Sequence, residues 1–174
     1  MREKLEPVFA LHYAGSPFSE ELRVPPELRV KTPCIGVCST GIGDNVCRGC
    51  KRFAHEVIHW NSFSEEQKRI IDERLDTFLS QVVLNKFRIF SAERLRLQCE
   101  AQQIRFPAYK TPAIWAWHLL RAGAGQIDDL AKYGLELDAQ FRGTSLPELK
   151  QMIDREFYLL SEAHYERYIL NARA

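Results

Sequence analysis

The sequence predicts a mostly α-helical fold in which a short four-cysteine metal knuckle precedes a small helical bundle. Two observations predict the helices: capping-box serines at Ser64 and Ser145 each precede a long apolar stripe. A third observation sets the N-terminal part aside, because residues 1–33 hold five of the eight prolines and show no sustained period. We therefore expect an extended N-terminal arm over 1–33, a four-cysteine metal-binding module over 34–62 and a helical domain over 63–174.

The first two helices are expected directly after the cysteines. A short helix begins near Phe53, where Phe53, Val57 and Trp60 fall on one face. The most strongly marked helix starts at Ser64, whose capping-box partner is Gln67, and it carries an apolar stripe over about five turns. The residues of this stripe are Ile70, Ile71, Leu75, Phe78, Leu79, Val82 and Val83.

Three more helices follow, each with its own start signal. A serine cap predicts a shorter helix over 91–99, and a Thr-Pro pair opens a helix over 111–123 that stops at a glycine. The terminal helix starts at the Ser145 and Glu148 capping box. We find no strand pattern of comparable strength and no internal repeat. The terminal stripe consists of Leu149, Ile153, Phe157, Leu160, His164 and Tyr168.

Composition limits the class of protein. The chain has 174 residues and 45% hydrophobic content, enough for one core, and its net charge of +1 gives no general attraction to nucleic acid or membranes. The first seven residues alternate in charge without the apolar stretch of a secretory signal, and no apolar run is long enough to span a bilayer. We expect a cytoplasmic protein, where clustered cysteines are more typical of metal ligands than of disulfides.

The main candidate site is formed by Cys34, Cys38, Cys47 and Cys50, with the spacing C-x3-C-x8-C-x2-C. Each close pair places two sulfurs on one turn of backbone, and the loop between the pairs lets them converge on one ion at about 2.3 Å per Zn–S bond. A closed shell of four thiolates favours structural zinc or an iron-sulfur cluster over metal catalysis. The fifth cysteine, Cys99, is predicted to be a buried packing residue.

These residues also carry a resemblance to a known family. The Pro33–Cys38 run, the Cys47–Cys50 pair and the Glu56-Val57-x-x-Trp60 pattern occur in that order over about residues 32–74. In this order they resemble the YdhL-type bacterial family, a domain of unknown function described as a predicted iron-sulfur protein. The resemblance implies a cluster, whereas two short knuckles joined by a turn favour zinc, so both cofactors stay open. It names no reaction and leaves residues 75–174 unexplained.

A second motif, His55-Glu56-x-x-His59, matches the H-E-x-x-H pattern of zinc peptidases. In those enzymes the two histidines hold zinc and the glutamate is the general base. The longer form with a glycine and a third histidine is absent, because Ser62 and Glu65 occupy those positions. We keep a zinc-dependent hydrolase as an alternative and prefer the interpretation that these are polar helix residues beside the cysteines.

Charge is distributed unevenly in the second half. Residues 86–121 carry a net charge of +5 and residues 126–166 a net charge of −5, so the two segments are expected to pair across a helical core. The alternative is a basic surface that binds RNA or DNA through stacking and phosphate contacts. The aromatic residues interleaved with these charges are Phe87, Phe90, Phe106, Tyr109, Trp115 and Trp117.

The function predicted from these features is non-enzymatic: a metal-stabilised regulatory module that binds a protein partner and no membrane. An iron-sulfur redox protein and the hydrolase are the alternatives, and RNA or DNA is the second partner class. Few sizeable apolar side chains lie between the first cysteine and Arg52, too few to order nineteen residues, so the knuckle is expected to depend on its metal. These apolar residues are Ile35, Val37, Ile42 and Val46.

Overall fold

The computed structural model describes residues 29–170, and within them it confirms the mostly α-helical class. Of the expected N-terminal arm only residues 29–33 fall in this range, and they form no helix or strand. The helices are α1 (Ala54–Ile58), α2 (Glu65–Leu84), α3 (Ala92–Ala101), α4 (Pro112–Gly123) and α5 (Leu146–Tyr165). The strands are β1 (Phe87–Ile89) and β2 (Leu135–Leu137), and a π-helical turn, Glu166–Leu170, extends α5.

The two long helices begin where their capping boxes predict. Ser64 Oγ accepts the backbone N–H of Gln67 at 3.2 Å, and Gln67 Oε1 accepts the N–H of Ser64 at 2.9 Å. Ser145 and Glu148 form the same reciprocal pair at the start of α5. Such pairs satisfy N–H groups that the first helical turn leaves without intrahelical partners, so both starts are encoded locally.

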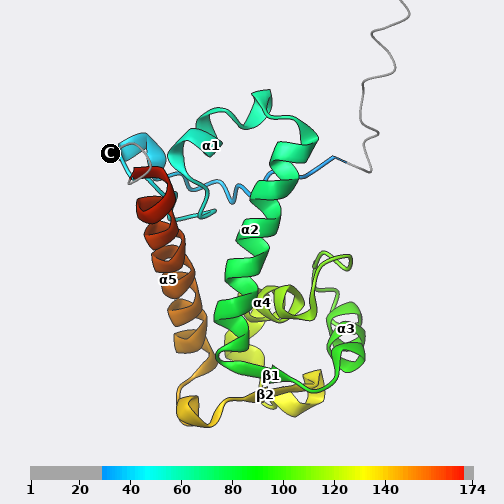
Figure 1. Ribbon diagram of the computed structural model, residues 1–174. Coiled ribbons are helices and arrows are strands. Elements are labelled where there is room, and N and C mark those ends of the chain that lie inside the picture. Colours follow the sequence, from blue (N-terminus) through cyan, green and yellow to red (C-terminus); the bar gives the residue numbers. More distant parts are fainter. Residues whose placement is uncertain (1–28, 171–174) are drawn as a thin grey trace, which may run out of the picture.

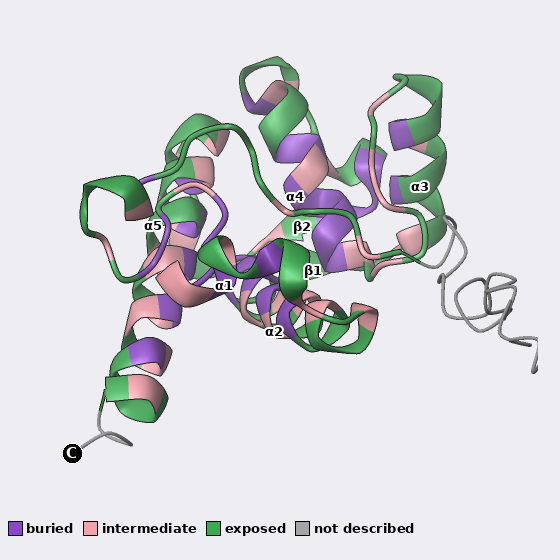
Figure 2. Ribbon diagram, turned by 90° about the horizontal axis from the view of Figure 1, so that it is seen from above, coloured by how far each residue is buried: buried purple, intermediate pink, exposed green. Residues whose placement is uncertain are grey.

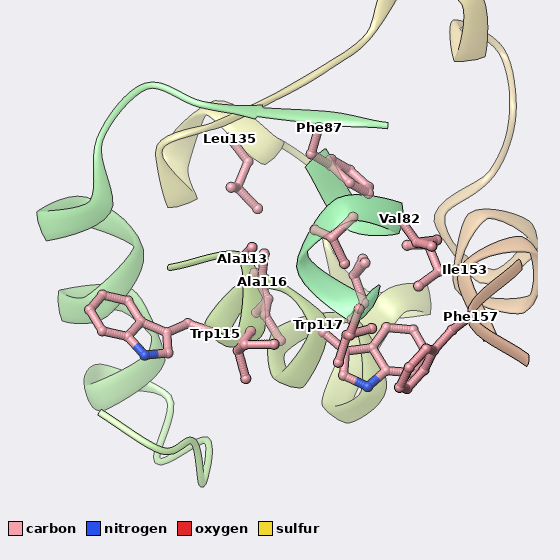
Figure 3. Close-up of a cluster of buried hydrophobic side chains, with 14 of the residues drawn as sticks. Val82, Phe87, Ala113, Trp115, Ala116, Trp117, Leu135, Ile153 and Phe157 are labelled. Atoms are coloured by element: carbon pink, nitrogen blue, oxygen red, sulfur yellow. The ribbon is translucent and has the colours of Figure 1, made fainter. Parts of the chain in front are cut away.

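Helix α2 lies at the centre of the fold and packs against α4 and α5 (Figure 1). Helix α4 is buried along most of its length (Figure 2), because its sequence is apolar on nearly every side. Trp115 and Trp117 leave α4 in opposite directions, and Trp117 lies beside Phe157 of α5 (Figure 3). The expected bundle of four helices after the module is therefore confirmed, with α4 as its most enclosed member.

The structure contains a short antiparallel sheet that the sequence pattern did not predict. Phe87 pairs with Leu137 and Ile89 with Leu135, while Arg88 faces Glu136 and forms an ion pair with it. Three residues are too few to show a period of two, and this pairing joins segments about fifty residues apart. A correction concerns Ile70, which the stripe placed in the core and which is 61% exposed.

The helix expected from Phe53 onward is shorter than its pattern suggested. Helix α1 has five residues, and Trp60 follows it in a separate 3-10 turn, Trp60–Ser62. Phe53 packs with Val46 and with Tyr165 of α5, whereas Trp60 joins the main core. None of the helices in residues 29–170 has the length and apolar character needed to cross a membrane.

Candidate metal centre

The second cysteine pair lies in a tight hairpin. Val46 and Phe53 form an antiparallel bridge, and inside it Cys47 N–H donates to Arg52 O at 2.8 Å. The N–H of Lys51 donates back to Cys47 O at 2.8 Å, and Lys51 has a φ of 60°, which closes the turn. Cys47 is 1% exposed and Cys50 is also buried. The hairpin therefore holds both sulfurs inside the protein.

The surroundings of Cys47 favour a thiolate. Burial alone raises its pKa, but the backbone N–H groups of Cys50, Ser39 and Gly49, together with the Cys50 side chain, lower the pKa from 9.0 to about 7. Burial raises the pKa of Cys50, and Arg52 opposes that rise because its Nε donates to the Cys50 sulfur at 3.3 Å. Amide and guanidinium donors of this kind also tune metal-bound thiolates in proteins.

The first cysteine pair lies in an exposed segment without regular structure. The N–H of Gly36 donates to Cys34 Sγ at 3.4 Å, and Cys38 Sγ lies 3.1 Å from Thr40 Oγ1. Gly36 has a φ of 86°, a conformation that favours glycine and turns the chain between the two cysteines. Both sulfurs are therefore open to solvent on a locally turned backbone.

The first segment crosses directly over the second pair at Gly49. A Cβ at position 49 would lie 2.3 Å from Val37 O and 3.2 Å from Ile35 Cγ1, so only glycine permits this approach. Ser39 Oγ accepts the N–H of Arg48 at 2.8 Å, and the Cys47 thiol donates to Val37 O at 3.7 Å. The backbone thus brings the two cysteine pairs into contact.

The sulfurs themselves do not all converge. Within residues 29–170, no three histidine, cysteine, aspartate or glutamate side chains gather closely enough to hold an ion. Cys34 and Cys50 line one cavity, while Cys38 bonds to its neighbour Thr40. The structure therefore shows two adjacent cysteine pairs, and four-sulfur ligation remains a prediction.

Three cations lie within two residues of Cys50 in the sequence, and their side chains behave differently. Arg48 pairs with Asp44 at 2.8 Å, and Lys51 is buried, where it donates to Arg48 O at 2.8 Å and forms an ion pair with Asp154 of α5. Arg52 stacks on the Trp60 ring at 4.6 Å, and its Nη1 is buried without a hydrogen-bond partner among the described residues. Arg52 is the cation placed to offset thiolate charge.

The H-E-x-x-H residues have another role in the structure. Glu56 is buried, its Oε2 accepts the N–H of Phe53 at 2.9 Å, and it forms an ion pair with Arg74 Nη2 at 2.7 Å. His59 ends the five-residue helix, and His55 packs near the Phe53 ring. The structure does not bring His55, Glu56 and His59 together as ligands, and Glu56 caps α1 and anchors α2.

Comparison with known families finds one whose model matches the cysteine region. Residues 32–78 match the family described as Protein of unknown function (DUF1289). The match confirms the resemblance to a domain of unknown function and extends it from residue 74 to 78, well into α2. It covers a segment only, and its description names no cofactor and no reaction. No curated protein and no solved structure matches the chain.

Sequence patterns gave no signal for several residues that support the DUF1289 segment. Arg74 lies 3.7 Å from the centroid of the Phe53 ring in addition to its ion pair with Glu56. Asp154, the partner of Lys51, and Tyr165, which packs on Phe53, both come from α5, outside the segment. Charged residues on amphipathic helices look like solvated faces until the packing of the helices is known.

The basic segment over residues 86–121 is largely paired. Lys86 is buried and bound to Glu156, Arg88 is bound to Glu136, and Lys110 bridges two aspartates of α2. Lys86 and Arg88 therefore make the pairs that were expected between the basic and acidic segments. Nucleic-acid binding through residues 86–121 stays an untested prediction.

Proposed function

We propose that Cys34, Cys38, Cys47 and Cys50 bind one metal centre, Zn²⁺ or an iron-sulfur cluster, and that the chain is a non-enzymatic module using this centre to fix a partner-binding segment. The contact of Val37 with Gly49 carries the proposal, because it brings the backbone of the segment with Cys34 and Cys38 against the turn with Cys47 and Cys50. The donors around Cys47 fit such a group because they lower its pKa, and the Arg52 Nε that donates to Cys50 favours the thiolate there against burial, which raises the pKa of Cys50.

Energetic considerations support a role for metal at the first pair. Residues 34–38 are all exposed, so burial of apolar surface supplies little of the free energy needed to order them. A structural zinc contributes about 10 to 16 kcal/mol of apparent binding free energy in small metal-folded peptides. Ligation of Cys34 and Cys38 would therefore be sufficient to hold this segment on the hairpin.

A protein partner is supported by exposed apolar side chains on the same segment. Ile35 is 50% exposed, Val37 66% and Ile42 85%, and all three lie between the first and third cysteines. Exposed apolar side chains that form one patch are typical of interaction sites, and we propose that these three form such a patch. The hydrolase alternative has less support, because Glu56 would need to reach a metal-bound water and is instead engaged by Phe53 and Arg74.

The test is elemental analysis with an absorption spectrum of protein purified without oxygen. We expect one centre per chain: zinc without visible absorption, or iron with sulfide and visible colour. Cys34→Ser and Cys47→Ser should each reduce the bound metal by at least tenfold, whereas the control Cys99→Ser, a buried cysteine far along the chain, should retain it. Metal that survives replacement of all four cysteines would overturn the proposal.

Partner binding is tested with a Val37→Asp/Ile42→Asp variant that still carries its metal. It should lose any protein that binds the wild type, while Leu97→Asp, an equally drastic change at an exposed position of α3, should keep it. Equal binding by both variants would place the partner elsewhere.

A further inference from the structure

Two adjoining cavities lie on the side of the helical body that faces the cysteines. The first, of about 540 Å³, is open on one side and is lined by α2, α4, α5, residues 31–35 and the turn that holds Cys50. The second, of about 360 Å³, lies between α4 and α5 and shares Trp117, Arg121 and Asp154 with the first. Small-molecule sites in proteins are of this size, about 300 to 1000 Å³, and are mostly lined by apolar and aromatic groups.

The floor of the larger cavity is apolar. It is made by three helices that also form the core, and two of its side chains, Trp117 and Phe157, lie side by side in Figure 3. The residues of this floor are Leu75, Leu79, Ile114, Trp117 and Phe157. An apolar part of a ligand would be removed from water here.

The charges around the two cavities are not balanced. The three carboxylates are already engaged: Asp72 and Asp76 bind Lys110 at 2.8 Å, and Asp154 binds Lys51. Within residues 29–170, by contrast, four cations that line the cavities have no carboxylate within ion-pair distance. These cations are Lys31, Arg121, Lys150 and Arg155.

Three of the free cations surround the smaller cavity. Arg121 comes from the last turn of α4, and Lys150 and Arg155 come from successive turns of α5. Guanidinium groups bind carboxylates and phosphates through paired N–H donors. We propose that the joined cavities bind a small amphipathic anion, its carboxylate or phosphate head held by Arg121, Lys150 and Arg155 and its apolar body on the floor beside Trp117. The cations and the apolar floor of this site come from α2, α4 and α5, whereas Cys34 and Cys50 of the proposed metal centre line another part of the larger cavity.

The test uses the full chain as purified and the fluorescent anion 8-anilinonaphthalene-1-sulfonate, displaced by dodecanoate or dodecyl phosphate. We expect saturable binding and displacement by both anions, with acetate at least a hundredfold weaker because it lacks an apolar body. Dodecyltrimethylammonium, which has the same tail and a positive head, should not compete. Absence of saturable binding, or equal competition by acetate or by the cation, would overturn the proposal.

Variants locate the site. Arg121→Glu/Arg155→Glu should weaken dodecanoate binding at least tenfold, because both exposed cations become anions. The control Lys132→Glu/Arg142→Glu makes the same change of charge at exposed positions outside both cavities, and it should bind within twofold of the wild type. Equal binding by the two variants would overturn the assignment. Displacement of the dye by a short single-stranded RNA at lower concentration than dodecanoate would reassign these cations to nucleic acid.

Discussion

The two cysteine pairs differ in what holds them. Cys47 and Cys50 lie in a hairpin closed by backbone hydrogen bonds and packed on α5 through Phe53 and Tyr165. Cys34 and Cys38 lie on a solvent-exposed segment that contacts the rest of the protein mainly at Gly49 and through Ser39. The second pair is thus fixed by the protein itself, whereas the first pair has few contacts that would hold it in place.

Because of this difference, we expect only the first cysteine pair, and not the whole knuckle, to depend on the metal for its order. Val46, Cys47 and Cys50 are buried and belong to a packed unit, so the hairpin has stabilising contacts of its own. The segment that lacks such stabilising contacts starts at Cys34 and ends near Ser39, which is the first buried residue after Cys34. Metal removal should therefore separate the two pairs rather than unfold both.

The largest expected effect is that of chelation. Removing the metal should raise hydrogen exchange across residues 32–40 by more than tenfold, because those amides have few protein partners. The N–H groups of Cys47 and Lys51, each hydrogen-bonded at 2.8 Å, should keep most of their protection. Hydrogen exchange with mass spectrometry checks this, and equal deprotection of both segments would show that the hairpin also depends on the metal.

Glu56→Ala is expected to be the most destabilising single substitution near the hairpin. It removes the acceptor for the Phe53 N–H and leaves Arg74 partly buried without its carboxylate, at a cost of about 3 to 5 kcal/mol. Urea denaturation measures the change in the free energy of unfolding. Glu66→Ala, at an exposed position in the first turn of α2, is the control and should stay within about 0.5 kcal/mol. If Glu56→Ala lowered the free energy of unfolding by less than about 1 kcal/mol, the anchoring role of Glu56 would be contradicted.

Gly49→Ala is aimed at the contact between the two pairs. The new methyl group would meet Val37 O at 2.3 Å, so the first segment must move away, at a cost of about 1 to 3 kcal/mol. We expect metal affinity to fall at least tenfold while the helical circular-dichroism signal is kept. Gly41→Ala, where no atom lies within 4 Å, should leave affinity unchanged. Unchanged affinity in Gly49→Ala would mean that the approach of the two pairs is not needed for binding.

The smallest expected effect is a pH dependence of the free energy of unfolding that comes from His164, which packs beside Phe53 of the hairpin. Burial lowers the pKa of His164 below 6.5, the charge of Arg74 lowers it further and Glu56 opposes them. The unfolded chain therefore takes up the proton at higher pH than the folded one, so stability is fully present above pH 6.5 and falls as the pH drops below it. His164→Phe keeps a ring beside Phe53 and Phe78 and should reduce the loss of stability between pH 7 and 5.

Part of the dependence of stability on pH should remain in this variant, because burial and the charge of Arg121 also lower the pKa of His118. An identical dependence in the variant and the wild type, measured by urea denaturation, would exclude this role of His164.

How much could be predicted from the sequence depended on how local the information was. The starts of α2 and α5 were predictable because Ser64 and Ser145 carry their capping partners three residues later. The β1–β2 pairing was not, since it depends on residues about fifty positions apart in strands of three residues. For the candidate site, the cysteine spacing singled out the four residues, and their ligation of one metal stays a prediction, whereas the close approach of Val37 to Gly49 depends on how the two segments pack.

What the spacing could not predict was the contribution of distant residues. The contrast between a buried and an exposed pair arises from α5, which supplies Asp154 to Lys51 and Tyr165 to Phe53. The role of Glu56 was also hidden, because its partner Arg74 lies eighteen positions downstream on another helix. A short motif such as H-E-x-x-H carries no information about such a partner.

The dependence of the hairpin on α5 has a consequence for where this chain can be cut. The DUF1289 match stops at residue 78, inside α2, whereas the side chains that cover the hairpin, Asp154 and Tyr165, lie about eighty positions further along the chain. An expression fragment limited to residues 32–78 would leave Phe53 and Lys51 uncovered and would break α2 before its last two turns. In this chain the hairpin and α5 therefore form one packed unit, and a fragment that keeps the hairpin should also keep α5.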